Sequence, residues 1–188
     1  MDIANYLQKH HFDGVQSEII RNHGEIQSFK KGDFFVTKGQ ISNRVGFILN
    51  GMFYAYEIDA QGNKKIFRFF YAPIFYLVVD YESYVRHKTS QFTIEALEDT
   101  QVLVFHKEQI ELLYATMPEF ARLYRYEVDQ MLIRTLRVIR IFQKSNTYER
   151  MQLLKNTSPE LFTRVPYSYL ASYLGVHRNT FSEAMKRL

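Results

Sequence analysis

The chain has 188 residues, of which 46% are hydrophobic and 23% charged, as in a globular protein of one or two domains. It contains no cysteine, which excludes disulfides, thiol catalysis, cysteine-bound zinc and iron–sulfur clusters. No apolar run reaches the ~18 residues of a membrane span, and the first residues, Met1–Gly14, are too charged for a signal peptide. We therefore expect a cytoplasmic protein that does not contact a membrane.

The net charge of +4 is concentrated near the C-terminal end. Residues 144–188 hold seven Lys or Arg against three Glu, whereas residues 1–143 hold 17 of each sign. A small basic segment on a neutral body favours a polyanionic partner, although a charge of this size also arises by chance.

The first half of the chain is predicted to be mainly β. A short helix reaches about residue 15, and from Glu25 to Phe105 short runs of Phe, Tyr, Val and Ile alternate with turn residues. The predicted strands are 34–37, 45–49, 52–56, 65–70, 92–97 and 101–105, with a tight turn at 50–51 and a hairpin loop at 59–63. This spacing indicates an antiparallel sandwich or barrel.

A helical region follows, with a short helix over 107–116 and a long one from Pro118 to about Gln143. The long helix carries an apolar stripe of near-heptad spacing: Tyr124, Val128, Met131, Thr135, Val138 and Phe142. A second stripe is formed by Leu132, Leu136 and Ile139. Two stripes suggest two partners, the chain's own barrel and the same helix of a second subunit. The alternative is that both stripes pack within one chain.

After a predicted hinge at 144–147, a helix is predicted over 148–156. The segments Ser158–Glu160 and Arg164–Pro166 are predicted to be loops. Two short helices then complete the sequence. In the first, over 167–174, Leu170, Ala171 and Leu174 face inward, and Gly175 ends it sharply. Val176 fills the space between the helices, and the second buries Phe181, Met185 and Leu188. A small residue followed by Gly and an apolar plug is typical of a helix-turn-helix.

The outward residues of the second helix are polar and begin with Arg178 and Asn179, where base edges are reached in a major groove. We predict base contacts from Arg178, Asn179, Ser182 and Glu183. Phosphate contacts are predicted from Tyr167, Ser168, Thr180, Lys186 and Arg187. The alternative is a purely structural helical hairpin.

The whole chain resembles the Crp/Fnr superfamily of bacterial regulators, in particular the short regulators of Bacteroidetes. The matching segments, in chain order, are 32–33, 42–51, 59–62, 94–104, the long helix, 148–154, 159–161, 164–166 and 169–175. The resemblance implies an α+β fold with an antiparallel β-roll (jelly-roll) sensor domain at 1–117, a dimerisation helix at 118–143, and a winged-helix-like helix-turn-helix domain at 144–188.

The resemblance also implies a homodimer on a near-palindromic operator in double-stranded DNA, with a small-molecule effector and RNA polymerase as further partners. The family's recognition positions fall on Arg178, Asn179 and Glu183, but Asn179 replaces a usual Glu and Glu183 a usual Arg. An acid there can accept from cytosine but repels phosphate, so we do not transfer the family's standard operator. Any C-terminal wing strands are missing or minimal.

The family's cyclic-nucleotide cassette is altered in this chain. Val79–Asp80 stand at its Gly-Glu pair and Thr89–Ser90 at its Arg-Ser pair, so the Gly and the phosphate-neutralising Arg are both lost. We therefore expect no cyclic AMP binding and no cofactor. The aromatic residues here, including Phe75, are packing or the lining for a less charged effector. The pocket candidates are Phe69, Tyr71, Asp80, Tyr81, Thr89 and Ser90.

The six histidines lack metal-ligand spacing, and no catalytic constellation stands out, so we predict neither a metal site nor an enzyme. A cupin-like metal barrel would need His and acids grouped on adjacent strands. The remaining alternative to a DNA-binding regulator is a ligand- or protein-binding sensor whose terminal helices only pack.

Overall fold

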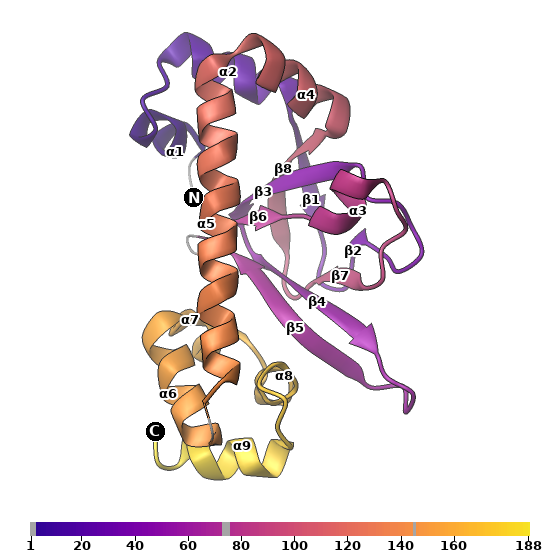
Figure 1. The fold of residues 1–188 in the computed structure, drawn as a ribbon, viewed down its shortest axis with the longest axis vertical. Coiled ribbons are helices and arrows are strands. Elements are labelled where there is room, and N and C mark those ends of the chain that lie inside the picture. Colours follow the sequence, from indigo (N-terminus) through magenta and orange to yellow (C-terminus); the bar gives the residue numbers. More distant parts are fainter. Residues whose placement is uncertain (1–2, 73–75, 145) are drawn as a thin grey trace. The chain divides into compact units, whose positions relative to one another are not determined.

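The computed structural model describes residues 3–72, 76–144 and 146–188 (Figure 1). Phe75 of the altered cassette and Ser145 of the predicted hinge lie outside the described residues. The chain divides into two units, Met1–Ala55 with Phe69–Val128, and Tyr56–Arg68 with Asp129–Leu188. Each unit is described by itself.

Two helices open the first unit, α1 (Ile3–Lys9) and α2 (Gly14–His23), where the sequence predicts one short helix. Asp13 caps α2: its carboxylate accepts from the Gln16 amide at 2.7 Å, and the Gln16 side chain accepts from the Asp13 amide at 3.1 Å. This reciprocal capping box starts a new helix at residue 14.

The strands form two antiparallel four-stranded sheets, ordered β1-β8-β3-β6 and β2-β7-β4-β5. The bounds are β1 Glu25–Phe29, β2 Phe34–Val36, β3 Arg44–Asn50, β4 Met52–Ile58, β5 Lys64–Tyr71, β6 Leu77–Val78, β7 Thr93–Ala96 and β8 Thr100–His106. All six predicted strands are present, and β1 and β6 add to them. Non-consecutive strands are neighbours in both sheets, as in a β-roll.

Aromatic side chains from both sheets fill the core of the roll. Phe53 packs against Phe29 at 5.3 Å and against Phe35 at 5.8 Å between ring centroids. The predicted tight turn is present at Gly51, which has φ +92 and lies so close to Thr100 that a Cβ would collide with it. The alternation of large apolar residues with turn residues thus builds a roll of two sheets with a packed aromatic core.

Three helices follow or interrupt the roll: α3 (Tyr81–Arg86), α4 (Lys107–Thr116) and α5 (Pro118–Phe142). The bounds of α4 and the start of α5 agree with the sequence prediction. The described parts contain no helix long and apolar enough to span a bilayer.

The second unit ends in four helices: α6 (Thr147–Thr157), α7 (Glu160–Arg164), α8 (Tyr167–Tyr173) and α9 (Arg178–Met185). Helix α7 was not predicted, and it includes Glu160 and Arg164, which the prediction placed in the loops Ser158–Glu160 and Arg164–Pro166. Pro159 precedes it with helical φ, and Leu161 is buried, so tertiary packing stabilises one turn that the loop-type residues hide. Among residues 146–188 no strand is present.

Candidate nucleic-acid interface

Helices α8 and α9 meet through the tight turn that the sequence predicts. Gly175 has φ +67, and the Val176 amide donates to the Ala171 carbonyl at 3.0 Å, which closes the end of α8. Leu170, Ala171 and Leu174 of this helix are buried, and so is Phe181 of α9. Val176, Met185 and Leu188 are half-buried. The two helices therefore share one apolar contact that fixes their crossing.

The polar residues of α9 face solvent. Those exposed are Arg178, Asn179, Thr180, Glu183, Lys186 and Arg187, and Ser182 is half-buried. His177 caps the helix, because its Nδ1 accepts from the Asn179 amide at 3.3 Å. The side chains predicted to contact bases thus lie on one uncovered face of a short capped helix.

The two predicted phosphate contacts on α8 lie at its start. Ser168 is exposed, and Tyr167 is exposed while its ring packs 5.5 Å from Phe181. The packing of its ring therefore holds Tyr167 beside α9, as a contact with a DNA phosphate requires.

A groove of about 530 Å³ lies between α9 and the start of α6. It is lined by Asn146, Thr147, Tyr148, Thr180, Glu183, Ala184 and Arg187. The predicted site residues Thr180, Glu183 and Arg187 are thus brought together with residues 146–148, which the prediction missed. The signal was present, since Asn146 and Glu149 have the spacing of a helix cap, and the Asn146 side chain accepts from the Glu149 amide at 2.9 Å.

Arg150 of α6 was also missed. Its Nε donates to the Lys144 carbonyl at 3.0 Å, and its Nη1 donates to the Leu174 carbonyl at 3.3 Å. One guanidinium thereby joins the residues after α5 to the end of α8. Cations favour carbonyl-rich helix C-termini, so this contact holds the helix-turn-helix at the predicted hinge.

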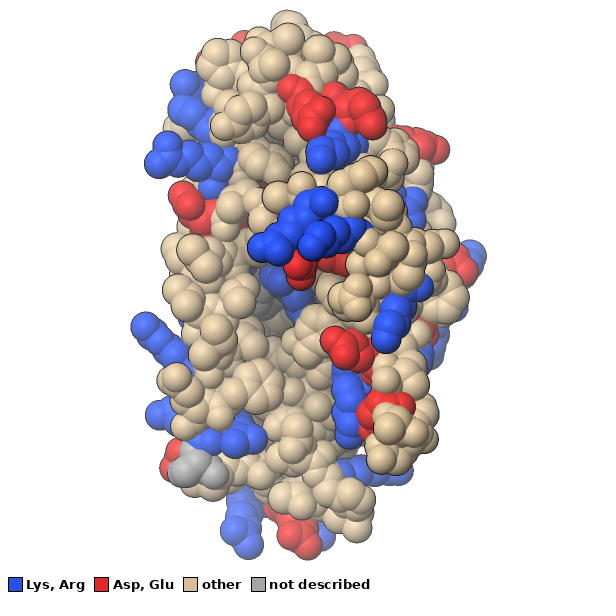
Figure 2. All heavy atoms as spheres, turned by 45° about the vertical axis from the view of Figure 1, so that its right-hand side comes forward, with Lys and Arg blue, Asp and Glu red and all other residues tan. Residues whose placement is uncertain are grey.

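The charges are dispersed. Figure 2 shows basic side chains in several separate groups, with acidic ones between them, on the face drawn. On the face drawn, acidic side chains interrupt the basic ones, so the described residues form no broad basic surface there.

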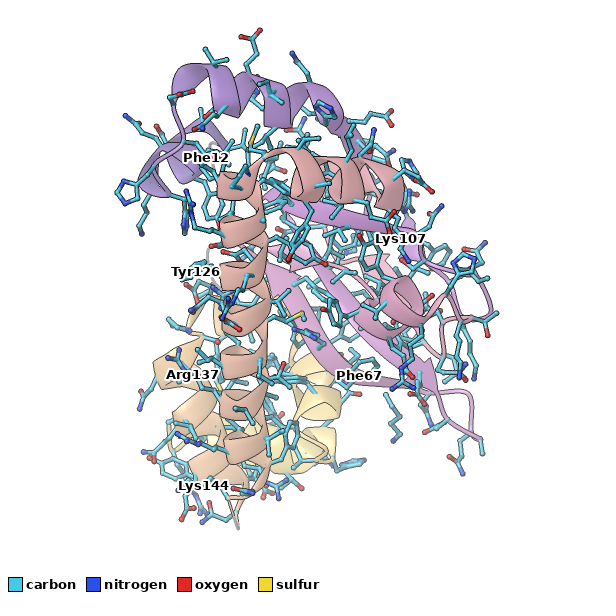
Figure 3. The ribbon with its side chains drawn as sticks, turned by 45° about the horizontal axis from the view of Figure 1, so that its top comes forward. Phe12, Phe67, Lys107, Tyr126, Arg137 and Lys144 are labelled. Carbon is cyan, nitrogen blue, oxygen red and sulfur yellow. The ribbon has the colours of Figure 1, made fainter. Side chains whose placement is uncertain are left out.

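The outer surface of α5 carries uncovered apolar residues. Of the two predicted stripes, Tyr124, Val128, Met131 and Val138 are half-buried within the chain, and Thr135 and Phe142 are exposed. In the second stripe Leu132 is 58% exposed, Leu136 50% and Ile139 48%. The uncovered heptad series consists of Leu132, Thr135, Ile139 and Phe142. Tyr126 and Arg137, which do not belong to this series, also lie on α5 (Figure 3).

In the first unit the predicted effector-pocket residues separate into two groups. Phe69, Tyr71, Asp80 and Ser90 are buried, whereas Tyr81 and Thr89 are exposed. Asp80, 2% exposed, caps α3, with its carboxylate accepting from the Ser83 amide at 3.1 Å. The side chain of Asp80 is thus used to cap the helix and is not open to solvent.

Serine hydroxyls around α3 form hydrogen bonds with neighbouring backbone groups. Ser83 Oγ accepts from the Ser42 amide at 2.8 Å and donates to the Lys88 carbonyl, and Ser90 Oγ donates to the Phe92 carbonyl at 2.7 Å. Ser42 and Ser83 were not predicted. These bonds occupy the Ser83 and Ser90 hydroxyls, whereas the buried Ser42 hydroxyl has no hydrogen-bond partner within the part of the chain that the structure describes.

Two tyrosines connect α3 to α5 within the first unit. Burial raises the pKa of Tyr124 to about 12 and also raises the pKa of Tyr84, and the proximity of each ring to the other contributes to the shifts. Further along α5, the buried Glu127 accepts from the Tyr6 hydroxyl and, at 3.3 Å, from the Tyr76 hydroxyl. Burial and the adjacent carboxylate raise the pKa of Tyr6. None of these contacts was predicted.

The comparisons with known proteins agree with this arrangement. Residues 26–117 match the family model of the cyclic nucleotide-binding domain. No curated protein matches the chain in sequence. The described residues contain no group of His, Asp and Glu suited to a metal ion.

The chain has the fold of Crp/Fnr regulators. FixK2 from Bradyrhizobium japonicum superposes with a TM-score of 0.69 at 16% identity, over 88% of this chain and 84% of its own. CLP, the c-di-GMP-responsive global regulator of Xanthomonas campestris, gives 0.69 at 14% identity, over 93% and 91%. A Crp/Fnr-family protein from Eubacterium rectale gives 0.67 at 14% identity, over 95% and 84%. The predicted fold class is confirmed.

Proposed function

We propose that this chain is a transcription regulator of the Crp/Fnr type that binds duplex DNA through α9. The observation that carries the proposal is the capped, uncovered polar face of α9, held by the buried contact with α8. Arg178, Asn179, Ser182 and Glu183 contact bases, and Tyr167, Ser168, Thr180, Lys186 and Arg187 contact phosphates. The start of α6, which lines one groove together with α9, adds a contact with the DNA phosphate backbone.

The regulator acts in the cytoplasm as a homodimer, with RNA polymerase as a further partner. The uncovered heptad series on α5 supports the dimer, because leaving it in water is costly. A parallel pair of α5 helices places two recognition helices about 34 Å apart, one DNA turn, on a near-palindromic operator.

The sensor does not bind cyclic AMP. Val79 replaces the glycine that lets the backbone approach a phosphate, and Thr89 and Ser90 replace the Arg-Ser pair whose arginine would neutralise it. Phe69 and Tyr71 are buried, which favours packing over the lining of a pocket for a less charged effector. Isothermal titration with cyclic AMP is expected to give no micromolar binding, and such binding would overturn this part of the proposal.

Selection of bound sequences from a random duplex pool tests the function itself. The selected duplex is expected to bind with an affinity that falls steeply with salt, because phosphate contacts release counterions. Absence of any enriched duplex would favour the alternative, a sensor whose terminal helices only pack.

Sedimentation of two charge variants tests the dimer. Leu132→Arg places a charge within the heptad series and is expected to give a monomer. Ile133→Arg is the matched control, since Ile133 is also exposed, at 41%, but lies outside the series. A dimeric Leu132→Arg protein would contradict the proposed dimer surface.

A further inference from the structure

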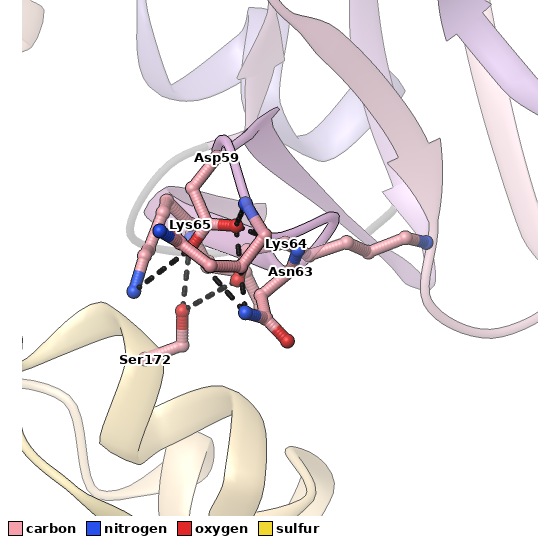
Figure 4. A network of polar contacts seen from close by, with 7 residues as sticks. Asp59, Asn63, Lys64, Lys65 and Ser172 are labelled. Atoms are coloured by element: carbon pink, nitrogen blue, oxygen red, sulfur yellow. Dashed lines mark hydrogen bonds and ion pairs between the residues drawn. The ribbon is translucent and has the colours of Figure 1, made fainter.

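A single serine joins the β4–β5 hairpin to the first helix of the helix-turn-helix. Ser172 Oγ donates to the Lys64 carbonyl at 2.8 Å and accepts from the Ile66 amide at 3.0 Å (Figure 4). Strand β5 is the outer strand of its sheet, so Lys64 and Ile66 present these groups on an edge without a neighbouring strand. The hydroxyl therefore fills the place of one rung of a β-ladder.

Serine suits this contact because its hydroxyl is both a donor and an acceptor. Ile66 is buried, and water therefore does not readily replace the lost partner of its amide. An alanine at 172 would leave the amide and the carbonyl without the hydroxyl that now bonds to both. The contact is thus sensitive to one oxygen atom.

The groups on both sides of this contact are held in place. On the hairpin, the Asp59 carboxylate accepts from the amides of Gln61 and Asn63 at 3.0 and 2.8 Å, and pairs with Lys65 at 3.2 Å. These bonds close the hairpin loop as an Asx turn.

On the helix side, Tyr173 is buried and packs 5.9 Å from Phe142 at the end of α5. The C-terminal end of α8 is thus held against α5 as well as bonded to the hairpin.

We infer that Ser172 is a positioning residue for DNA recognition, through which the β4–β5 hairpin sets the placement of α8 and hence of α9. The inference rests on the proposed function. Ser168, a predicted phosphate contact, lies one helical turn before Ser172 on the same face of α8. Both strands of the hairpin continue into the sensor sheet, so a shift of that sheet reaches α8 through the hairpin as well as through α5.

The test compares wild type with Ser172→Ala, Ser172→Thr and Thr163→Ala. Affinity for the selected duplex is measured by fluorescence anisotropy, and the Ile66 amide is followed by hydrogen exchange. Thr163→Ala is the matched control, because the Thr163 hydroxyl bonds only within its own helix, to the Glu160 carbonyl at 3.0 Å. Ser172→Ala is expected to lose about tenfold in affinity, with faster exchange at Ile66. Ser172→Thr keeps the hydroxyl and should restore both.

Three results would overturn the inference while leaving the proposed function intact. They are unchanged Ile66 exchange in Ser172→Ala, wild-type affinity despite faster exchange, and an equal loss in Thr163→Ala. A wild-type protein that binds no duplex would overturn the proposed function and this inference together. This outcome is read from the wild-type protein alone, so it is distinguished from the three variant results.

Discussion

Helices α3 and α9 are both short and both begin at a side-chain cap, yet their polar groups differ in burial and in hydrogen bonding. At α3, Asp80, Ser83 and Ser90 are buried and bonded to the protein's own backbone. At α9, the residues from Arg178 to Arg187 that are polar lie mostly in solvent.

The contrast explains why one helix is proposed as a binding site and the other is not. A ligand gains affinity from donors, acceptors and charges that are free to turn toward it. Those of α9 are exposed, whereas those of α3 already stabilise the fold. The polar residues around α3 are thus part of the structure of the roll.

The largest expected effect tests the support of α9. Phe181→Ala removes a fully buried ring between α8 and α9 and should lower the free energy of unfolding by about 3–5 kcal/mol, as measured in urea. Met185→Ala, at a half-buried position of the same helix, should cost less. Equal costs would mean that Phe181 is not the residue that fixes the crossing.

Arg178→Ala tests the exposed face of α9. It should weaken binding to the selected operator by about 1–3 kcal/mol and relax specificity at one base in each half-site. Lys186→Ala should instead weaken binding uniformly and reduce the salt slope by about 1. Unchanged specificity in Arg178→Ala would sink its assignment as a base contact.

Asp80→Ala tests whether the polar groups of α3 are structural. Loss of a side-chain cap should lower the free energy of unfolding by about 0.5–2 kcal/mol in thermal or urea unfolding. The control is Glu82→Ala, on the same helix but exposed. An Asp80→Ala protein as stable as this control would show that the carboxylate is available to a ligand, and the contrast with α9 would fail.

The smallest effect concerns pH at the hairpin. Hydrogen bonds from the Asn63 amide and its neighbours hold the pKa of Asp59 below its ordinary value near 3.8. Because the folded pKa is depressed, the stabilisation is complete above the ordinary value and is lost as pH falls through the folded one. Hydrogen exchange at Ile66 should therefore quicken below about pH 4. Asp59→Asn keeps the acceptor oxygen without the charge and should abolish this pH dependence.

The C-terminal helices were largely predictable because their signals are local. Leu170, Gly175 and Phe181 lie within a dozen residues, and their spacing alone predicts two crossing helices with one polar face. The long helix and the six strands follow from periodicity in the same way. Helix α7 escaped prediction, because a single turn stabilised by the burial of Leu161 has no period to detect.

What the sequence by itself determined is therefore the order of the elements, the helix-turn-helix and the altered cassette, since each depends on neighbours in the chain. Only the tertiary structure decided which α5 residues stay uncovered, and that Asp80 caps α3 from a buried position. It alone paired Tyr6 with Glu127 and Ser172 with β5, across separations of 121 and 106 residues. Such contacts depend on how distant elements pack, and neither residue type nor spacing encodes them locally.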